Sequence, residues 1–260
     1  MLADLWTRTY RSICSITAFE SSKRIGSGTG FKVGNRLVTN YHVVQLPTAT
    51  QFEFRFVGVD SQTDSISKVF STSELLASTS DSMPIDSWDY IILDPDWAEL
   101  AAIPSLTLAS NDQLRIGQPI ALFGYQFDQA NLSIHSGILS SRFVVNGVKI
   151  LQVDASVNQG NSGGPLVDPI NSQVIGIVTR KLTGLTEEFD KLMESFARNV
   201  KVLEQSRGSV RIMVAGIDPI EALRLTQAQM ARVSIEIKRA ANVGVGYAYE
   251  VEKIRQGIQK

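Results

Sequence analysis

Short apolar runs separated by turn residues occupy most of the first 180 positions of the chain. The runs at 13–19, 52–57, 119–124 and 174–179 are rich in β-branched and aromatic residues. Their length, their partial alternation with polar residues and the turns between them predict short strands rather than helices. Such a succession of strands indicates an all-β protein built from barrels or sandwiches.

Two tight turns help to set the limits of these strands. Gly34-Asn35 separates two runs that end near His42, and Asn146-Gly147 lies within the stretch from 143 to 151. Both turns are typical of β-hairpins, and the first hairpin is expected to place His42 at the end of a strand. The polar stretch from 78 to 82 reads as a loop.

The hydrophobic period changes between Thr183 and Asn242, where apolar residues recur every three or four positions. The stretch from 185 to 203 predicts an amphipathic helix that begins near Thr186. Asp218, followed by Pro219 and by Glu221, is a capping signature for a second helix that could reach Arg239. A strand-like run at 243–251 and a short helix at 252–258 follow, and another short helix is expected at 3–11. The helical pair is therefore an insertion between two strands.

Composition describes an ordinary globular protein with no electrostatic specialisation. The chain has 260 residues, 43% of them hydrophobic and 20% charged, with a formal net charge of −1. This length allows one large β unit or two smaller ones. A charge so close to zero gives no attraction to nucleic acid or to an anionic membrane, so neither is an expected partner.

Cysteine and histidine are scarce, which bears on location and on cofactors. The single Cys14 excludes an intramolecular disulfide, the first residues do not resemble a secretory leader, and no run is long enough to span a membrane. These features favour a soluble, cytoplasmic protein. One cysteine and two well-separated histidines provide no zinc-binding spacing, so we expect no metal and no cofactor.

A candidate nucleophile lies in the glycine-rich stretch from Asp154 to Val167. Ser162 is flanked by glycines, with a strand-like run on either side. A serine hydroxyl needs a base to remove its proton and N–H donors to meet the oxyanion that forms. Glycines let the backbone bend so that several N–H groups point at one place, and Gly160, Asn161 and Ser162 are the candidate donors.

Other interpretations of the glycine-rich stretches are weaker. The segment fits Gly-x-Ser-x-Gly, but that nucleophile elbow requires a histidine after the serine. The only histidines, His42 and His135, both precede Ser162. A glycine-rich hairpin with an incidental serine remains the structural alternative. The glycines at 26–30 lack the Gly-Lys-Ser/Thr ending of a phosphate loop.

His42 and Asp89 are the best candidates for a base and its orienting acid. Asp89 directly precedes the apolar run 90–93, where its carboxylate would lie at the edge of a core and orient an imidazole. A strand-start aspartate and a packed core histidine are the alternatives. His135 alternates within an apparent strand and fits the core role better. With His135 as the base, the chain order would be that of subtilisins, whose α/β pattern is missing here.

Taken together, these motifs resemble the chymotrypsin-fold (trypsin-like) serine proteases, especially their HtrA/Deg branch. They are, in chain order, Gly28-x-Gly30-Phe31, the run 37–44 that contains His42, Asp89 before an aliphatic run, Ser136 to Ser140, and Asp154 to Leu166. The resemblance covers about residues 11 to 180. It implies two six-stranded antiparallel β-barrels with an inserted α-helical hairpin. The expected parts are an N-terminal barrel with a short helix (1–110), a second barrel with a closing helix (111–182 and 243–260) and the insert (183–242).

The same resemblance implies a serine endopeptidase. Ser162 would be the nucleophile, His42 the general base and acid, and Asp89 the orienting carboxylate. The oxyanion hole would be formed by the N–H groups of Gly160 and Ser162, with Asn161 between them. Peptide bonds would be cleaved through an acyl-enzyme on Ser162.

Residues for substrate binding follow from the resemblance as well. Thr179, Arg180 and Lys181 would line the groove and pair with an extended peptide. Ser156, six residues before Ser162, would lie near the base of the specificity pocket. No acid occupies that position, so a small apolar residue is preferred over Lys or Arg. Arg180 and Lys181 leave a preference for an acidic residue as the alternative.

Two departures from the family concern the end of the chain. HtrA proteins usually end in PDZ domains, and no such domain follows here. The insert at 183–242 interrupts the expected last two strands, where it would act as a lid, a regulator or a docking arm for a regulatory protein, or would be a packed decoration. Besides a protein or peptide substrate, such a partner is expected. The functional alternative is a non-catalytic scaffold that binds a peptide or a partner protein through the protease fold.

Overall fold

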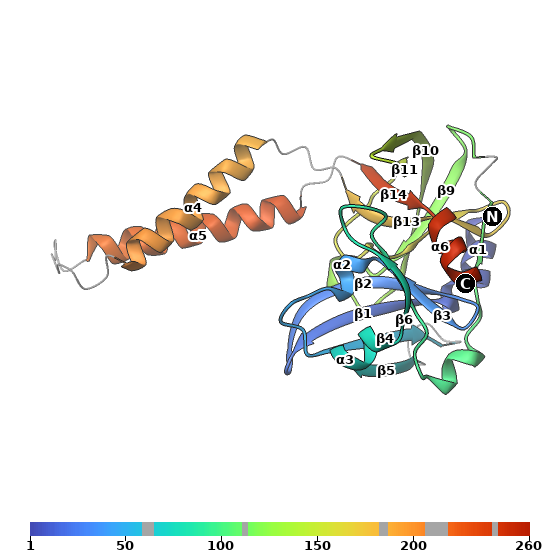
Figure 1. Cartoon of the computed structure of the whole chain (residues 1–260). Helices are drawn as coiled ribbons and strands as arrows, with labels where there is room; N and C mark the ends of the chain where they lie inside the picture. The colour runs from blue at the N-terminus through green and yellow to red at the C-terminus, as the bar shows by residue number, and fades with distance from the viewer. Residues whose placement is uncertain (59–64, 111–113, 182–186, 206–217, 241–243) are drawn as a thin grey trace. The chain divides into compact units, whose positions relative to one another are not determined.

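The computed structural model describes residues 1–58, 65–110, 114–181, 187–205, 218–240 and 244–260. The chain divides into two compact units, Met1–Leu182 with Gly244–Lys260, and Thr183–Val243. Figure 1 shows two β-sheets in the first unit and a pair of long helices in the second.

The first sheet is antiparallel, with the strand order β5-β4-β1-β2-β3-β7-β6. Its strands are β1 (Ile13–Glu20), β2 (Lys23–Val33), β3 (Arg36–Thr39), β4 (Gln51–Val57), β5 (Ser65–Ser71), β6 (Thr79–Met83) and β7 (Tyr90–Leu93). Six strands were expected and seven are present. In the described residues no backbone ladder joins the edge strands β5 and β6.

The additional strand β6 corrects the loop expected at 78–82. It pairs with β7, with Ser82 opposite Ile91 and Met83 opposite Tyr90. Serine, threonine and aspartate disfavour strands by local propensity, but strand preference depends on the neighbour more than on the residue. Backbone pairing with the apolar strand β7 holds this polar segment in place as the edge strand of the sheet.

The second sheet closes into a six-stranded antiparallel barrel. Its strand order is β12-β9-β10-β11-β14-β13, and β12 pairs with β13 to complete the circle. A short strand, β8, adds to β13 in parallel, which the antiparallel expectation did not include. The strands are β8 (Thr107–Leu108), β9 (Pro119–Gly124), β10 (Ser133–Val145), β11 (Val148–Asp154), β12 (Pro165–Asp168), β13 (Gln173–Lys181) and β14 (Val245–Glu250). The all-β, chymotrypsin-like fold class is confirmed.

One buried apolar cluster joins the two sheets. It contains Phe31 and Ile92 from the first sheet together with Phe123 and Ile177 from the second. Separate clusters fill the interior of each sheet. Because close-packed side chains hold their elements in fixed positions, loops from both sheets can build one site between them.

The helices at the two ends of the chain each contact the sheet that is farther away along the sequence. In α1 (Leu2–Thr9), Trp6 stacks on Phe123 of the second barrel at 6.2 Å between ring centroids. In α6 (Glu252–Gln259), the carbonyl of Gly257 accepts a hydrogen bond from Arg36 of the first sheet. Each helix had been expected with the barrel nearest in sequence. These two contacts join each terminal helix to the other sheet.

Short helical segments complete the first unit. They are η1 (Tyr10–Ser12), α2 (Tyr41–Val44), α3 (Thr72–Ala77), η2 (Ala98–Ala102) and η4 (Gln126–Asp128). α3 begins with a capping box in which Ser71 and Glu74 exchange side-chain to backbone hydrogen bonds. The most relevant to the site is α2, because it carries His42.

The second unit is an α-helical hairpin of α4 (Glu187–Gln205) and α5 (Pro219–Ala240). Asp218 caps α5 as expected, since its Oδ1 accepts hydrogen bonds from the N–H groups of Ile220 (3.0 Å) and Glu221 (3.2 Å). Across the hairpin, Asn199 donates to Gln227 at 3.2 Å. The expected start at Thr186 lies outside the described residues.

Candidate active site

Strand register in the first sheet brings His42 and Asp89 together. β3 pairs with β7, with Thr39 opposite Ile91. His42 follows the end of β3, and Asp89 precedes the start of β7, so both side chains lie at the same edge. His42 Nδ1 lies 2.7 Å from Asp89 Oδ2, and the His42 backbone N–H donates to Oδ1 at 3.1 Å. With Nδ1–H donating to the carboxylate, Nε2 is left as a proton acceptor.

Asp89 is held by contacts to its backbone as well as its side chain. Its φ of 42° is in the left-handed region, and the side-chain amide of Asn40 donates to the Asp89 carbonyl at 2.7 Å. Thr179 Oγ1 donates to Oδ2 at 3.0 Å. The carboxylate, which is 1% exposed, therefore accepts three hydrogen bonds, and these fix its orientation.

Ser162 lies in the loop between β11 and β12 and is partly buried. Its Oγ donates a hydrogen bond to the carbonyl of Thr179 at 2.9 Å. Thr179 therefore contacts Asp89 through its hydroxyl and Ser162 through its carbonyl. Among the described residues no hydrogen bond joins Ser162 to His42. A contact between this hydroxyl and the imidazole requires another rotamer of Ser162.

Two glycines with positive φ shape the loop around Ser162. Gly160 has φ +94°, and a Cβ there would lie 2.0 Å from the carbonyl oxygen of Tyr125. Gly163 has φ +83°, and a Cβ there would lie 2.2 Å from the Thr29 carbonyl. Both positions combine a backbone conformation that other residues rarely adopt with a contact that excludes a side chain.

Backbone hydrogen bonds fix the two peptide units that join Gln159 to Gly160 and Asn161 to Ser162. The Gln159 carbonyl accepts from the N–H of Phe127 at 2.8 Å, and the Asn161 carbonyl accepts from Gly164 at 2.9 Å. In a trans peptide the N–H points opposite to the carbonyl, so these bonds orient the N–H groups of Gly160 and Ser162. Neither N–H has an acceptor within the described part of the chain.

Asn161 differs from its two neighbours in this loop. Its own N–H donates to the carbonyl of Asn158 at 3.1 Å. Its side chain is fully buried, and no described group pairs with either amide atom. The N–H of Asn161, one of the three candidate oxyanion donors, is thus engaged with Asn158, and Asn161 lies between the two free N–H groups.

Thr29 on β2 holds this loop against the first sheet. Its Oγ1 donates to the Gly160 carbonyl at 2.6 Å and accepts from the Tyr125 N–H at 3.0 Å. Its N–H donates to the Ser162 carbonyl at 2.9 Å. Sequence reasoning did not single out Thr29 or Asn40, although both lie inside the motifs that carry the resemblance.

The expected substrate-binding residues are only partly described. Ser156 is exposed in the loop that follows β11. The backbones of Arg180 and Lys181 pair with Tyr247 and Gly246 of β14, whereas their side chains lie outside the described residues. The specificity pocket and the groove remain predictions.

His135 and Cys14 lie apart from the pairs described above. His135 is in β10 opposite Leu122, and burial lowers the pKa of its imidazole. Cys14 is fully buried in β1, and burial raises the pKa of its thiol. A partly buried imidazole whose pKa is lowered and a fully buried thiol whose pKa is raised fit structural roles.

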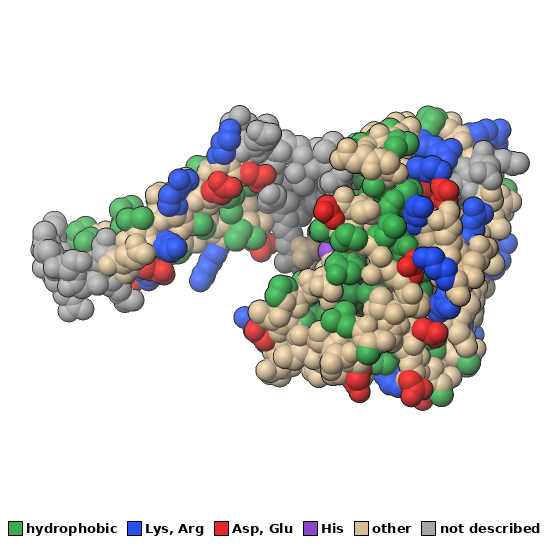
Figure 2. Space-filling view, viewed as in Figure 1, with side chains coloured by type: hydrophobic (Ala, Val, Ile, Leu, Met, Phe, Trp, Pro, Cys, Tyr) green, Lys and Arg blue, Asp and Glu red, His purple; other side chains and the backbone are tan. Residues whose placement is uncertain are grey.

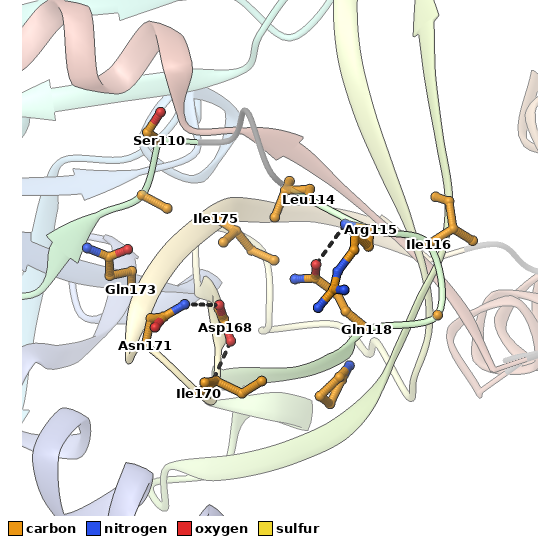
Figure 3. Close-up of a pocket in the computed structure, with 13 residues that line it drawn as sticks. Ser110, Leu114, Arg115, Ile116, Gln118, Asp168, Ile170, Asn171, Gln173 and Ile175 are labelled. Carbon is orange, nitrogen blue, oxygen red and sulfur yellow. Dashed lines mark hydrogen bonds between the residues drawn. The ribbon is translucent and has the colours of Figure 1, made fainter.

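A separate pocket of about 810 Å³ lies at one end of the second barrel (Figure 3). Arg115 and Gln118 line it from the loop before β9, and Asp168 and Asn171 line it from the β12–β13 turn. The Asp168 carboxylate accepts from the Asn171 amide at 2.8 Å. None of His42, Asp89 and Ser162 lines this pocket.

The described ranges contain neither a cluster of metal ligands nor a membrane-spanning helix. No three or more His, Cys, Asp or Glu side chains gather there as a metal ion would require. None of the helices in those ranges is both long enough and apolar enough to cross a membrane.

Curated relatives match part of the chain. It is 30% identical over 174 residues to a probable periplasmic serine endoprotease, DegP-like, of Chlamydia trachomatis, covering 60% of this chain and 29% of the relative. It is 30% identical over 177 residues to Protease Do-like 5, chloroplastic, of Arabidopsis thaliana, covering 65% and 52%. The chain thus spans less than a third of the bacterial relative.

Solved structures share the fold. The HtrA-type protease AlgW with tripeptide superposes with a TM-score of 0.62 at 19% identity, covering 100% of this chain and 62% of that one. A serine endoprotease from Yersinia pestis gives 0.54 at 23% identity, covering 70% and 58%.

The family model for the trypsin-like peptidase domain matches residues 28–177, which is more than half of the chain. The matched range contains His42, Asp89 and Ser162. The relatives confirm the resemblance to the HtrA/Deg branch. The chain belongs to the trypsin-like peptidase family.

Proposed function

We propose that this protein is a serine endopeptidase with Ser162 as nucleophile, His42 as general base and acid, and Asp89 as the orienting carboxylate. The observation that carries the proposal is the 2.7 Å contact between His42 Nδ1 and the buried Asp89 carboxylate. It leaves Nε2 as the proton acceptor. Membership of the trypsin-like peptidase family supports the same assignment.

The reaction begins with a rotation of the Ser162 side chain from the Thr179 carbonyl toward His42. His42 Nε2 takes the hydroxyl proton while Oγ forms a bond to the scissile carbonyl carbon, and the carbonyl π electrons move onto oxygen. The N–H groups of Gly160 and Ser162 stabilise that oxyanion. When the C–N bond breaks, His42 gives its proton to the leaving amine. Water then hydrolyses the acyl-enzyme by the same steps.

An extended peptide is the proposed substrate. The segment Thr179 to Lys181 at the end of β13 pairs with the substrate backbone, as a strand adds to a sheet. The Thr179 carbonyl, which the Ser162 rotation frees, becomes an acceptor for a substrate N–H. Ser156 near the pocket base favours a small apolar side chain before the cleaved bond.

The test of this activity is cleavage of casein and of a peptide library by the wild-type chain and by Ser162→Ala. We expect wild type to release new N-termini, mainly after small apolar residues, and Ser162→Ala to release none. Ser133→Ala, a serine in β10, is the matched control and keeps the activity. Cleavage that persists in Ser162→Ala would assign the activity to another residue or to a contaminant.

We also propose that the insert regulates access to this site. The insert follows β13, which ends at Lys181. Thr179 of this strand is hydrogen-bonded to both Asp89 and Ser162. A displacement of the end of β13 would therefore move a hydrogen-bond partner of Asp89 and of Ser162. Replacing residues 184–241 by a short linker should change the rate of peptide turnover. An unchanged rate, with the β unit still folded, would make the insert irrelevant to catalysis.

A further inference from the structure

The described residues of the helical hairpin form no apolar core of their own. Among its described residues no hydrophobic side chain is buried, and the only buried side chain is that of Ser234. Figure 2 shows apolar surface between charged side chains on the visible face of the two helices. Two helices alone gain little stability from local propensity and depend on packing of an amphipathic face. The hairpin therefore needs a further surface to pack against.

α4 and α5 contribute differently to their shared contact. α4 carries larger apolar residues at heptad spacing, which are only partly buried: Phe189, Met193, Phe196, Val200 and Leu203. From α5, Gln227 bonds Asn199, and Arg224 lies 4.0 Å from Glu204. α5 thus uses polar and small residues toward α4.

Four of the larger exposed apolar residues of α5 form a second, separate row, whereas Leu225 and Ile235 lie outside it. Leu223, Met230, Val233 and Ile237 are 50%, 46%, 58% and 48% exposed. With Thr226 they follow the 3–4–3–4 spacing of a heptad repeat, and we call these five residues the α5 stripe. The stripe extends about 21 Å along the helix. A sustained heptad pattern is typical of helices that pack lengthwise against another helix.

Charge indicates which surface fits the α5 stripe. α5 contains four basic and two acidic residues, a net charge of +2, whereas α4 contains three basic and five acidic residues, a net charge of −2. An α4 helix therefore attracts an α5 helix, and α4 also exposes Leu192 (46%) and Val202 (54%). With the two helices together at zero net charge, an anionic membrane is not favoured.

We infer that the hairpin binds the hairpin of a second copy of this chain. In the resulting four-helix bundle, each α5 stripe packs against the α4 of the partner. Such an interface is self-complementary under a two-fold axis, because each copy supplies one α4 and one α5. The bundle supplies the core that a single hairpin lacks. This inference does not depend on the peptidase activity.

The test measures the mass of the full chain in solution across a concentration series by sedimentation velocity. Wild type is expected to be a dimer. Met230→Glu places a charge in the middle of the α5 stripe and should weaken dimerisation by about 100-fold or more. Thr226→Glu does the same without removing an apolar side chain, so it separates loss of the interface from loss of folding. Circular dichroism confirms that each variant remains helical.

Leu225→Glu is the matched control. Leu225 is 47% exposed on the same helix, but it lies about 200° around the helix from Leu223 and off the α5 stripe. This variant should remain dimeric. A monomeric wild type, or a dimer that survives both Met230→Glu and Thr226→Glu, would overturn the inference. If Leu225→Glu dissociated the dimer as strongly as Met230→Glu, the inference would be overturned as well. Protection of the stripe from hydrogen exchange in a monomer would assign it to the protein's own β unit.

Discussion

The Asp89→Asn variant is expected to lose about 10⁴-fold in kcat, with little change in KM. Oδ2 of Asp89 accepts hydrogen bonds from His42 Nδ1 and Thr179 Oγ1, while Oδ1 accepts from the His42 backbone N–H. An amide offers only one oxygen for these three donors. Its NH₂ group favours the imidazole tautomer with the proton on Nε2, which cannot accept the Ser162 proton.

The comparison that isolates this effect uses Asp86→Asn. Asp86 is exposed and lies three residues before Asp89, so the same chemical change there should leave kcat unchanged. Steady-state kinetics on a cleaved peptide, with melting temperatures to verify folding, provides the measurement. An Asp89→Asn enzyme with wild-type kcat would remove Asp89 from the proposed mechanism.

The second large effect is expected at Gly160. Gly160→Ala places a Cβ 2.0 Å from the Tyr125 carbonyl oxygen at a backbone φ of +94°. The loop must move, and the N–H of residue 160 then leaves the oxyanion position. Loss of one oxyanion donor typically costs about 10²–10³-fold in kcat, and we expect a loss of that order.

Gly147→Ala is the control for backbone strain alone. Gly147 also has a positive φ, +80°, but nothing lies within 4 Å of a Cβ at that position. The alanine there should cost about 1 kcal/mol of folding stability and leave kcat unchanged. If Gly160→Ala were as active as Gly147→Ala, the N–H of Gly160 would not be an oxyanion donor.

The sequence was most informative where one local signal matched a tertiary role. The apolar runs at 119–124 and 174–179 became β9 and the central part of β13, because their residues pack in barrel cores. Asp218 and Pro219 predicted the start of α5, since capping depends on adjacent residues only. His42 was expected at the end of a strand and lies instead in α2, just after β3. Asp89 directly precedes β7, and the pairing of β3 with β7 brings the two residues together.

Features that depend on distant contacts could not be predicted in this way. Strand β6 exists because β7 offers it a partner, and the terminal helices pack on the far half of the β unit through Trp6 and Arg36. Thr29 holds the loop around Ser162 through hydrogen bonds to two residues more than 95 positions away, Gly160 and Tyr125. The Ser162 rotamer depends on the Thr179 carbonyl. Cellular location also stays a prediction.

Intact-mass spectrometry after treatment with a fluorophosphonate probe tests the central claim most directly. The probe forms a stable bond only with a serine whose proton a neighbouring base can remove. The account predicts one adduct on wild type, none on Ser162→Ala and greatly slowed labelling of His42→Ala. No adduct on folded wild type, with the insert present or removed, would contradict it, as would an adduct that persists in Ser162→Ala.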